Sequence, residues 1–267
     1  MTEPFHQPRK RFGQHFLRDQ TILQKMTHAI DPKPEQHLVE IGPGEGVLTA
    51  FILPLCTKMD AIEIDRDLVR HLQQRFHHYP QFHVHAHDVL KFDWRRLTTT
   101  PHSLRIMGNL PYNISTPLLF NLFNVIDLIQ DMHFMLQKEM VLRMTARVGD
   151  SNYNRLSVMT QYFCHNERLF DIPPSAFFPP PQVDSAVIEM HPRTPDIIAK
   201  STPLLATLVR TAFNQRRKTI HNAIKTLITT QHLQDLGIDD QLRPQQLTIN
   251  NFVKISNFLY DSQVCSK

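Results

Sequence analysis

Three groups of residues in this chain have types and spacings suited to chemistry on a nucleotide-like ligand. The first is a glycine loop, Gly42-Pro43-Gly44-Glu45-Gly46, which lies between a predicted strand and a predicted helix. Glycines let the backbone turn sharply and approach a ligand closely, and the start of a helix offers unpaired N–H groups. The spacing is GxGxG, whereas dinucleotide-binding loops favour GxGxxG. The loop therefore predicts a nucleotide-cofactor site.

The second group consists of two acids that follow the next two predicted strands. Glu63 ends the second strand about 20 residues after the loop, where a carboxylate can accept hydrogen bonds from both ribose hydroxyls. Asp88 follows the third strand, where it could face an adenine amino group. The alternative is a structural turn with two solvated acids. Even together, the loop and the acids do not separate S-adenosylmethionine from a nicotinamide cofactor.

The third group is Asn109-Leu110-Pro111-Tyr112, after the fourth predicted strand. It resembles the [N/D]-P-P-[Y/F/W] signature of methyltransferases that act on amines conjugated to an aromatic ring. Such an amine is a poor nucleophile, because its lone pair is delocalised into the ring. An Asn oxygen and a backbone carbonyl can accept its hydrogens, the proline shapes the turn, and Tyr112 can stack on the base. The alternative is a plain proline turn between a strand and a helix.

These groups must be positioned by alternating strands and helices. Short apolar runs predict strands at 37–41, 59–64, 82–86, 104–107 and 133–136, with a closing pair at 169–172 and 186–190. Helical patterns occupy 18–30, 47–55, 66–77, 115–129, 139–148 and 154–164, and Ser115 and Pro117 suggest a hydroxyl cap and a first-turn proline for the fourth. This order predicts an α/β fold, with a mostly parallel, Rossmann-like sheet of seven strands covered on both faces.

The pattern changes after Pro192. Residues 202–262 show only helical spacing, which predicts a small helical domain at 193–267 beside a larger domain at 1–192, whose first 11 residues form a basic arm. The larger domain holds 19 Lys and Arg against 20 Asp and Glu, a net charge of −1, while the smaller holds 10 against 5, a net of +5. The positive charge therefore lies in the small domain, which suggests an anionic partner there.

Composition excludes several classes of protein. The 267 residues are 41% hydrophobic and 20% charged, as in a globular protein. No secretory signal or membrane-spanning run is expected, so we predict a cytoplasmic protein without a membrane partner. The three cysteines form no CxxC pair and suit a reducing compartment. His83, His85 and His87 alternate along one strand face, where a metal site is possible but a solvated face is favoured, so no metal is expected.

The whole pattern resembles the ribosomal RNA adenine dimethyltransferase family, in particular its bacterial small-subunit branch. The motifs that carry this resemblance run from residue 11 to residue 219. They are Arg11-Phe12-Gly13-Gln14-His15-Phe16-Leu17, Glu40-Ile41-Gly42-Pro43-Gly44, Gly108-Asn109-Leu110-Pro111-Tyr112-Asn113-Ile114-Ser115, Phe177-x-Pro179-x-Pro181-x-Val183-x-Ser185 and Phe213-Asn214-Gln215-Arg216-Arg217-Lys218-Thr219. The resemblance implies a class I methyltransferase sheet with S-adenosylmethionine as methyl donor.

The same resemblance implies roles for individual residues. Tyr112 and Phe177 would sandwich the target adenine beside the turn of Asn109, Leu110 and Pro111. The family dimethylates N6 of two adjacent adenosines in the 3′-terminal hairpin of 16S rRNA, late in assembly of the 30S subunit, and we expect this chain to do so as a monomer. The donor-binding residues would be His15, Leu17, Gly42, Gly44, Glu63, Asp88 and Asn109.

Two basic segments are candidates for RNA binding. If 204–228 formed one helix, an apolar face with Phe213, Ile220 and Leu227 would lie beside a basic stripe, suited to phosphate contacts. The alternative for each segment is an ordinary solvated surface. The candidate residues are Arg210, Arg217, Lys218 and Lys225 of the stripe, and Arg9, Lys10 and Arg11 of the arm.

Three other functions compete with this interpretation. A Rossmann oxidoreductase accounts for the glycine loop and Glu63 but leaves Asn109 to Tyr112 unexplained. A non-catalytic assembly or transcription factor need not keep the donor pocket. A large-subunit rRNA methyltransferase that confers antibiotic resistance is less consistent with the length and basic tail of the small domain, with its FNQRRKT run.

Overall fold

The computed structural model describes residues 15–265, which form two compact units. The first contains residues 15–141 and 167–192, and the second contains residues 142–166 and 193–265. The second unit thus includes a segment, 142–166, that we predicted to belong with the sheet. Its helix packs against the C-terminal helices, an association between distant parts of the chain that hydropathy alone does not reveal.

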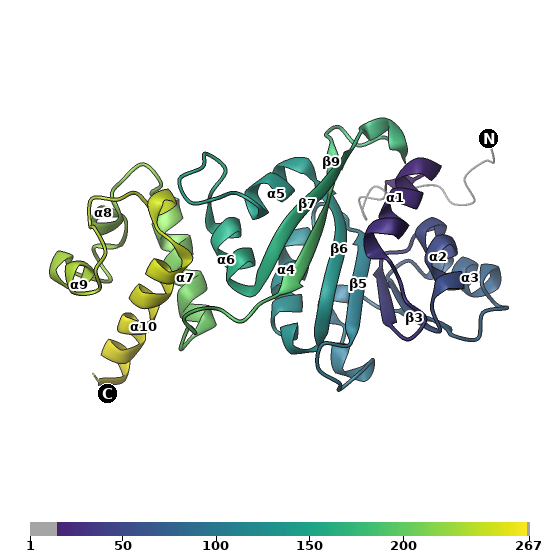
Figure 1. Ribbon diagram of the computed structural model, residues 1–267, viewed down its shortest axis with the longest axis horizontal. Helices are drawn as coiled ribbons and strands as arrows, with labels where there is room; N and C mark the ends of the chain where they lie inside the picture. Colours follow the sequence, from purple (N-terminus) through teal and green to yellow (C-terminus); the bar gives the residue numbers. More distant parts are fainter. Residues whose placement is uncertain (1–14, 266–267) are drawn as a thin grey trace. The chain divides into compact units, whose positions relative to one another are not determined.

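A seven-stranded sheet forms the centre of the first unit, as predicted (Figure 1). Its strand order is β4-β3-β2-β5-β6-β9-β7. The pairs from β4 to β6 are parallel, and β9 runs antiparallel to β6. A separate two-stranded ribbon joins β1 to β8. The strands are Phe16–Leu17 (β1), His37–Ile41 (β2), Lys58–Glu63 (β3), Phe82–Ala86 (β4), Leu104–Asn109 (β5), Ile129–Gln137 (β6), Cys164–Ile172 (β7), Phe177–Phe178 (β8) and Ser185–Pro192 (β9).

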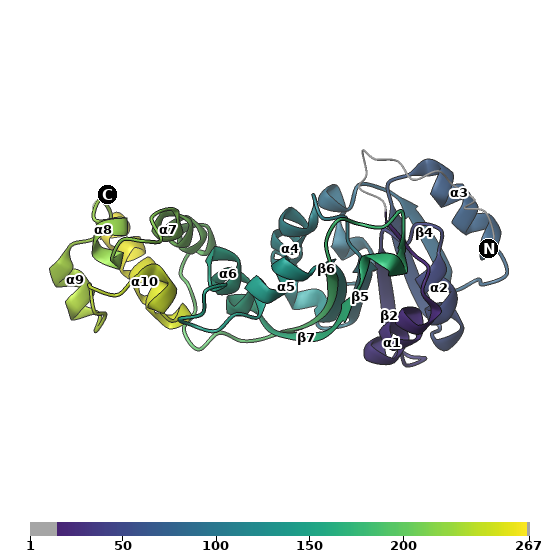
Figure 2. The ribbon, with the colours of Figure 1, turned by 90° about the horizontal axis from the view of Figure 1, so that it is seen from above.

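Helices cover both faces of this sheet, and α1 and α4 lie on opposite sides of it (Figures 1 and 2). The helices of the chain are Gln20–Ile30 (α1), Val47–Ile52 (α2), Arg66–Arg75 (α3), Ser115–Phe123 (α4), Lys138–Met144 (α5), Arg155–Phe163 (α6), Thr202–Asn214 (α7), Ile220–Ile224 (α8), Thr230–Asp235 (α9) and Ile249–Cys265 (α10). Short 3-10 turns occupy Leu53–Leu55, Val89–Lys91, Trp94–Arg96, Ile126–Leu128, Pro174–Ala176 and Pro244–Gln246.

The core beneath α1, α2 and α3 fixes the position of α1. Alternate residues of the central strands, among them Leu38 and Met107, face this core together with Leu23 of α1. The buried Arg105 of β5 reinforces the contact, because its guanidinium donates to the Ile30 carbonyl at the end of α1 (2.6 Å) and pairs with Asp131 of β6 (2.8 Å). The short strand β1, which leads into α1, is thereby held beside the sheet.

The helical unit corrects one prediction directly. Residues 204–228 do not form a single helix, because α7 ends at Asn214 and α8 begins at Ile220. The N–H of Ile220 donates to the Leu242 carbonyl (2.6 Å), and Thr219 caps the new helix. The predicted stripe is therefore divided between two helices and the turn that joins them, and Leu227 of its apolar face is exposed.

The predicted hydroxyl cap of α4 was also wrong. Its N-cap is Ile114, without a side-chain bond, and Ser115 lies inside the helix. The Ser115 hydroxyl instead donates to the Pro111 carbonyl (2.9 Å). The residue thus stabilises the turn that precedes the helix.

The histidines of β4 have separate surroundings. His85 contacts Asp60 of β3 (2.6 Å), which also contacts His37 (2.6 Å), whereas His83 is exposed. Among residues 15–265, no group of three or more metal-ligating side chains is placed to hold an ion.

Candidate active site

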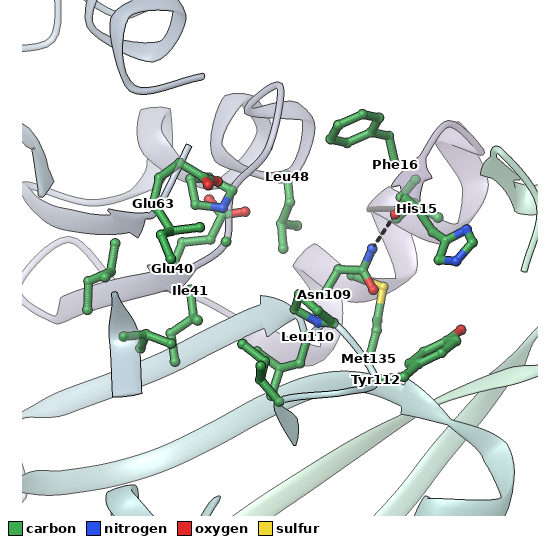
Figure 3. Close-up of a pocket in the computed structure, with 18 of the residues that line it drawn as sticks. His15, Phe16, Glu40, Ile41, Leu48, Glu63, Asn109, Leu110, Tyr112 and Met135 are labelled. Atoms are coloured by element: carbon green, nitrogen blue, oxygen red, sulfur yellow. Dashed lines mark hydrogen bonds between the residues drawn. The ribbon is translucent and has the colours of Figure 1, made fainter. Parts of the chain in front are cut away.

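A cavity opens at the carboxyl ends of β2, β3 and β5, beside the residues that follow β4 (Figure 3). Most of the predicted catalytic and donor-binding residues line it, although they come from five separate parts of the sequence. Glu40 and Glu63 lie on one side of it, and His15, Asn109 and Tyr112 on the other. The predicted residues in its wall are His15, Leu17, Gly42, Glu63, Asp88, Asn109, Leu110, Pro111 and Tyr112.

The glycine loop has the backbone that its composition predicts. Gly44 has a φ of +60°, a conformation that side chains disfavour, and a Cβ there would lie 2.8 Å from Cε1 of Phe16. Gly44 does not itself line the cavity, but Phe16 does. The absence of a side chain therefore lets the ring of Phe16 close over the loop.

Glu63 holds the glycine loop from β3. Its carboxylate is buried, and it accepts hydrogen bonds from the N–H groups of Gly44 (3.2 Å) and Asp65 (2.9 Å). Burial raises the pKa of Glu63, while these two N–H groups oppose the rise. Asp88 follows β4, the strand that pairs with β3; it is half-buried and accepts a hydrogen bond from the Leu90 N–H (3.0 Å).

The orientation of Asn109 is fixed by the chain just before α1. Asn109 Nδ2 donates to the His15 carbonyl, 2.7 Å away, and a carbonyl oxygen can only accept (Figure 3). The amide group of Asn109 must therefore turn its nitrogen toward His15. Its oxygen, Oδ1, remains as a hydrogen-bond acceptor at the cavity wall.

Tyr112 is held at both its ring and its hydroxyl. The hydroxyl lies 2.8 Å from Oγ of the buried Ser185, at the start of β9. The His15 ring stacks against the Tyr112 ring, with centroids 6.0 Å apart and an angle of 26° between the planes. The sequence motif contained Ser185 but did not indicate this contact, which depends on the pairing of β9 with β6.

Phe177 is not brought into the cavity. Its side chain is 5% exposed and packs in the core that includes Leu17 and Val187. This position differs from the expected one beside the target base, because the pairing of β8 with β1 turns Phe177 to the same side of the ribbon as Leu17.

The remaining candidates lie elsewhere. Those of the helical unit, Arg210, Arg217, Lys218 and Lys225, are all exposed. Arg9, Lys10 and Arg11 lie outside the described residues.

Glu40 is a cavity-lining acid that our choice of site residues omitted. It lies in β2, two residues before Gly42. The sequence signal that could have identified it is an acidic residue inside an otherwise apolar strand. Its carboxylate is fully buried and accepts from the Thr49 hydroxyl (2.6 Å). Burial raises its pKa from 4.5 to about 7, and the nearby Glu63 adds to the rise.

This raised pKa predicts a pH dependence of stability. Between pH 4.5 and about 7 the folded chain holds more protons at Glu40 than the unfolded chain, so the free energy of unfolding falls as pH rises through this range. Glu40→Gln removes this penalty and keeps an acceptor for Thr49. We expect the variant to be more stable than wild type by about 3 kcal/mol near pH 8, with little difference near pH 4.5. Urea unfolding of both proteins between pH 4.5 and 8 measures this difference in the free energy of unfolding. A difference that does not change with pH contradicts the prediction.

Comparison with known proteins agrees with this geometry. A model of the family described as ribosomal RNA adenine dimethylase matches residues 5–261. The chain is 53% identical over 254 residues to a ribosomal RNA small subunit methyltransferase A of Coxiella burnetii, covering 94% of this chain and 97% of that protein. It is 48% identical over 258 residues to the protein of the same name from Marinobacter nauticus, covering 96% and 93%.

Solved structures are similar over the same length. A dimethyladenosine transferase from Plasmodium falciparum has a TM-score of 0.80 at 28% identity, covering 93% of this chain and 98% of that one. The 23S rRNA methyltransferase ErmE has a TM-score of 0.71 at 22% identity, covering 92% and 99%, which is a likeness of fold. From the family match and these relatives we conclude that the chain is a methyltransferase of the ribosomal RNA adenine dimethylase family.

Proposed function

We propose that this enzyme transfers methyl groups from S-adenosylmethionine to N6 of two adjacent adenosines in the 3′-terminal hairpin of 16S rRNA, giving N6,N6-dimethyladenosine. The observation that carries the proposal is the fixed amide of Asn109, which presents Oδ1 at the wall of the cavity. The enzyme acts in the cytoplasm as a monomer, late in assembly of the 30S subunit.

The donor pocket is formed by the residues around the glycine loop. The buried carboxylate of Glu63 and the positive-φ glycine loop, in which Phe16 covers Gly44, fit a ligand with a ribose and a polar tail. Asp88 would accept a hydrogen bond from the adenine amino group of the donor, Gly42 would allow close approach, and Gly44 would shape the loop beneath Phe16. When bound, the donor supplies a methyl group activated by the positive charge on its sulfur. His15, Leu17, Gly42, Gly44, Glu63, Asp88 and Asn109 are the residues that hold it.

The N6 amine that accepts the methyl group donates its two hydrogens to two oxygens of the protein. Asn109 Oδ1 accepts one N6 hydrogen. The Pro111 carbonyl already accepts from the Ile114 N–H (3.1 Å) and the Ser115 hydroxyl, so we assign the second hydrogen to the Leu110 carbonyl. These contacts favour a tetrahedral nitrogen whose lone pair points at the methyl group. Placement then supplies most of the rate, and the proton leaves after transfer.

Tyr112 provides the surface on which the extracted adenine rests. Its ring is fixed by Ser185 and His15 before the base arrives, so little conformational entropy is lost on stacking. An adenine removed from its helix exposes a π-face that an aromatic ring can cover. The cavity thus combines two hydrogen-bond acceptors for the N6 amine with an aromatic surface for the base.

The other candidate functions are weaker on specific grounds. An oxidoreductase has no use for an oriented Asn beside a proline turn. A binding protein without activity has no need of the buried Glu63 contacts that hold the glycine loop. A large-subunit target is disfavoured by the small-subunit names of the relatives that are about half identical over nearly the whole chain.

The helical unit supplies phosphate contacts. Residues 142–166 and 193–267 hold 13 Lys and Arg against 6 Asp and Glu, a net charge of +7, whereas the rest of the chain has 16 against 19, a net of −3. Arg217 and Lys218, in the turn between α7 and α8, are exposed, as are Arg210 and Lys225. These four residues and the basic arm, Arg9 to Arg11, are proposed to bind the RNA backbone.

Reversing the charges of Arg217 and Lys218 should weaken binding to the small subunit by about tenfold and flatten its salt dependence, because each lost phosphate contact reduces the slope by roughly one. The measurement is subunit affinity as a function of salt concentration. Lys254→Glu, an exposed reversal on α10, is the control for a charge reversal outside the turn, and it should leave the salt slope unchanged. An unchanged slope in the double variant contradicts the phosphate contacts.

The proposed function is tested by incubating the protein with undermethylated small subunits and labelled donor, followed by mapping of the modified bases. Dimethylation of two neighbouring adenines near the 3′ end is the expected result. Label in another base or in the large subunit overturns the proposal.

A further inference from the structure

Two adjacent phenylalanines of β8 have opposite surroundings. Phe177 is 5% exposed, whereas Phe178 is 47% exposed, among the large hydrophobic side chains most accessible to solvent. Phe178 leaves about half of a large apolar side chain in contact with water, which costs free energy, although single exposed side chains are common. The position of Phe178 in the ribbon indicates which kind of ligand would cover its ring.

The register of the ribbon places Phe178 opposite Phe16, a residue of the cavity wall. In the antiparallel pair of β1 and β8, Phe178 is opposite Phe16, and Phe177 is opposite Leu17. Directly opposed residues project to the same face, with Cβ atoms roughly 5 Å apart. Phe177 packs in the core with Leu17, which also reaches the cavity wall, while Phe16 lines the cavity and lies over Gly44. Phe178 is therefore the cross-strand neighbour of a ring in the cavity wall, and it is open to solvent.

The backbone around Phe178 is held by two contacts with the segment that contains β1. The backbone of β8 is paired with β1, and the next carbonyl, that of Pro179, accepts a hydrogen bond from His15 Nδ1 (2.7 Å). His15 is the residue whose own carbonyl orients Asn109. The segment that orients the Asn109 amide therefore also holds the backbone next to Phe178.

We propose that Phe178 stacks on the base next to the adenine in the cavity, as a second aromatic surface for the RNA. This inference rests on the proposed function, in which two adjacent adenosines are modified, so that the neighbouring base is a purine with a large π-face. When one adenine enters the cavity, its neighbour loses a stacking partner. An exposed ring on a backbone that is held beside β1 replaces that partner without selecting for sequence.

The test is steady-state methylation of undermethylated small subunits by Phe178→Ala, with Phe178→Trp as the conservative variant. We expect the KM for subunits to rise roughly tenfold in Phe178→Ala and to stay near wild type in Phe178→Trp, which keeps a stacking ring. Val183→Ala, which shortens another exposed apolar side chain of the same loop, is the matched control and should leave KM unchanged. Donor affinity, measured by calorimetry, should be equal in all four proteins.

A second arm identifies the stacked base. Subunits are reconstituted with rRNA in which the nucleotide beside one target adenine is abasic. On this substrate the wild type and Phe178→Ala should have the same KM, because the base that distinguishes them is absent. An alanine variant with wild-type KM on intact subunits, or with a loss that persists on the abasic substrate, overturns the inference. Failure of the proposed function appears separately, as absence of adenine methylation by the wild type.

Discussion

Asn109→Ala should lower the rate constant for methyl transfer by at least about 100-fold, the size of effect seen when one oriented polar contact to a reacting group is removed. The substitution deletes Oδ1, which is proposed to accept an N6 hydrogen and favour a nucleophilic nitrogen. It also removes the bond to the His15 carbonyl, so the segment before α1 loses one of its attachments to β5. RNA binding, which depends on surfaces outside the cavity, should be largely retained.

The measurement is single-turnover transfer from labelled donor to undermethylated small subunits, with subunit affinity determined in parallel. Asn124→Ala removes the same side-chain amide from an exposed position at the end of α4 and is expected to behave as wild type. If Asn109→Ala turned over at the wild-type rate, Asn109 could no longer be assigned as the hydrogen-bond acceptor for the N6 amine. An equal loss in both variants would point to a general effect of amide deletion on the fold.

Glu63→Gln should weaken donor binding by about 100-fold, because two charge-assisted hydrogen bonds of roughly 1.5–3 kcal/mol each are affected. Each carboxylate oxygen of Glu63 accepts from a backbone N–H, one from Gly44 and one from Asp65. A glutamine has only one acceptor oxygen, so its NH2 group must face one of these donors in a buried site. The glycine loop is then displaced, and an acceptor proposed for the ribose is lost.

Isothermal titration with S-adenosylmethionine measures this effect directly. Asp67→Asn, on the exposed side of α3, makes the same change of charge at a surface ion pair with Arg70 and should leave donor affinity unchanged. Thermal unfolding in the absence of donor shows whether the fold is intact. Donor affinity near that of wild type in Glu63→Gln would contradict the role of this carboxylate.

Much of the fold and of the cavity was predictable from local patterns. Alternation of short apolar runs with helical spacing is enough to predict a parallel sheet, and its central strand His37–Ile41 is buried on both faces. The carboxyl ends of parallel strands share one edge, so a glycine loop, Glu63, Asp88 and Asn109 at successive strand ends were expected to meet, and they line one cavity. Spacing along the chain determined this much, because strand ends of a parallel sheet are aligned by the direction of the chain.

The tertiary structure decided the features that depend on contacts between distant residues. The orientation of the Asn109 amide depends on a carbonyl 94 residues away in the sequence. Which of the two phenylalanines of β8 is buried depends on the register of β8 against β1, and a shift of one residue would reverse it. Likewise, the break between α7 and α8 depends on a hydrogen bond from Ile220 to Leu242.

The sequence by itself thus determined the succession of strands and helices along the chain, the composition of the loops and the chemistry available at the sheet edge. Only the tertiary structure decided which side of a short ribbon faces the cavity, how an amide is turned, and which helices carry the positive charge. The physical reason is that periodicity reports how a residue relates to its neighbours in the chain. Hydrogen bonds and registers between separate segments are selected by packing and by satisfaction of buried polar groups, which no local pattern encodes.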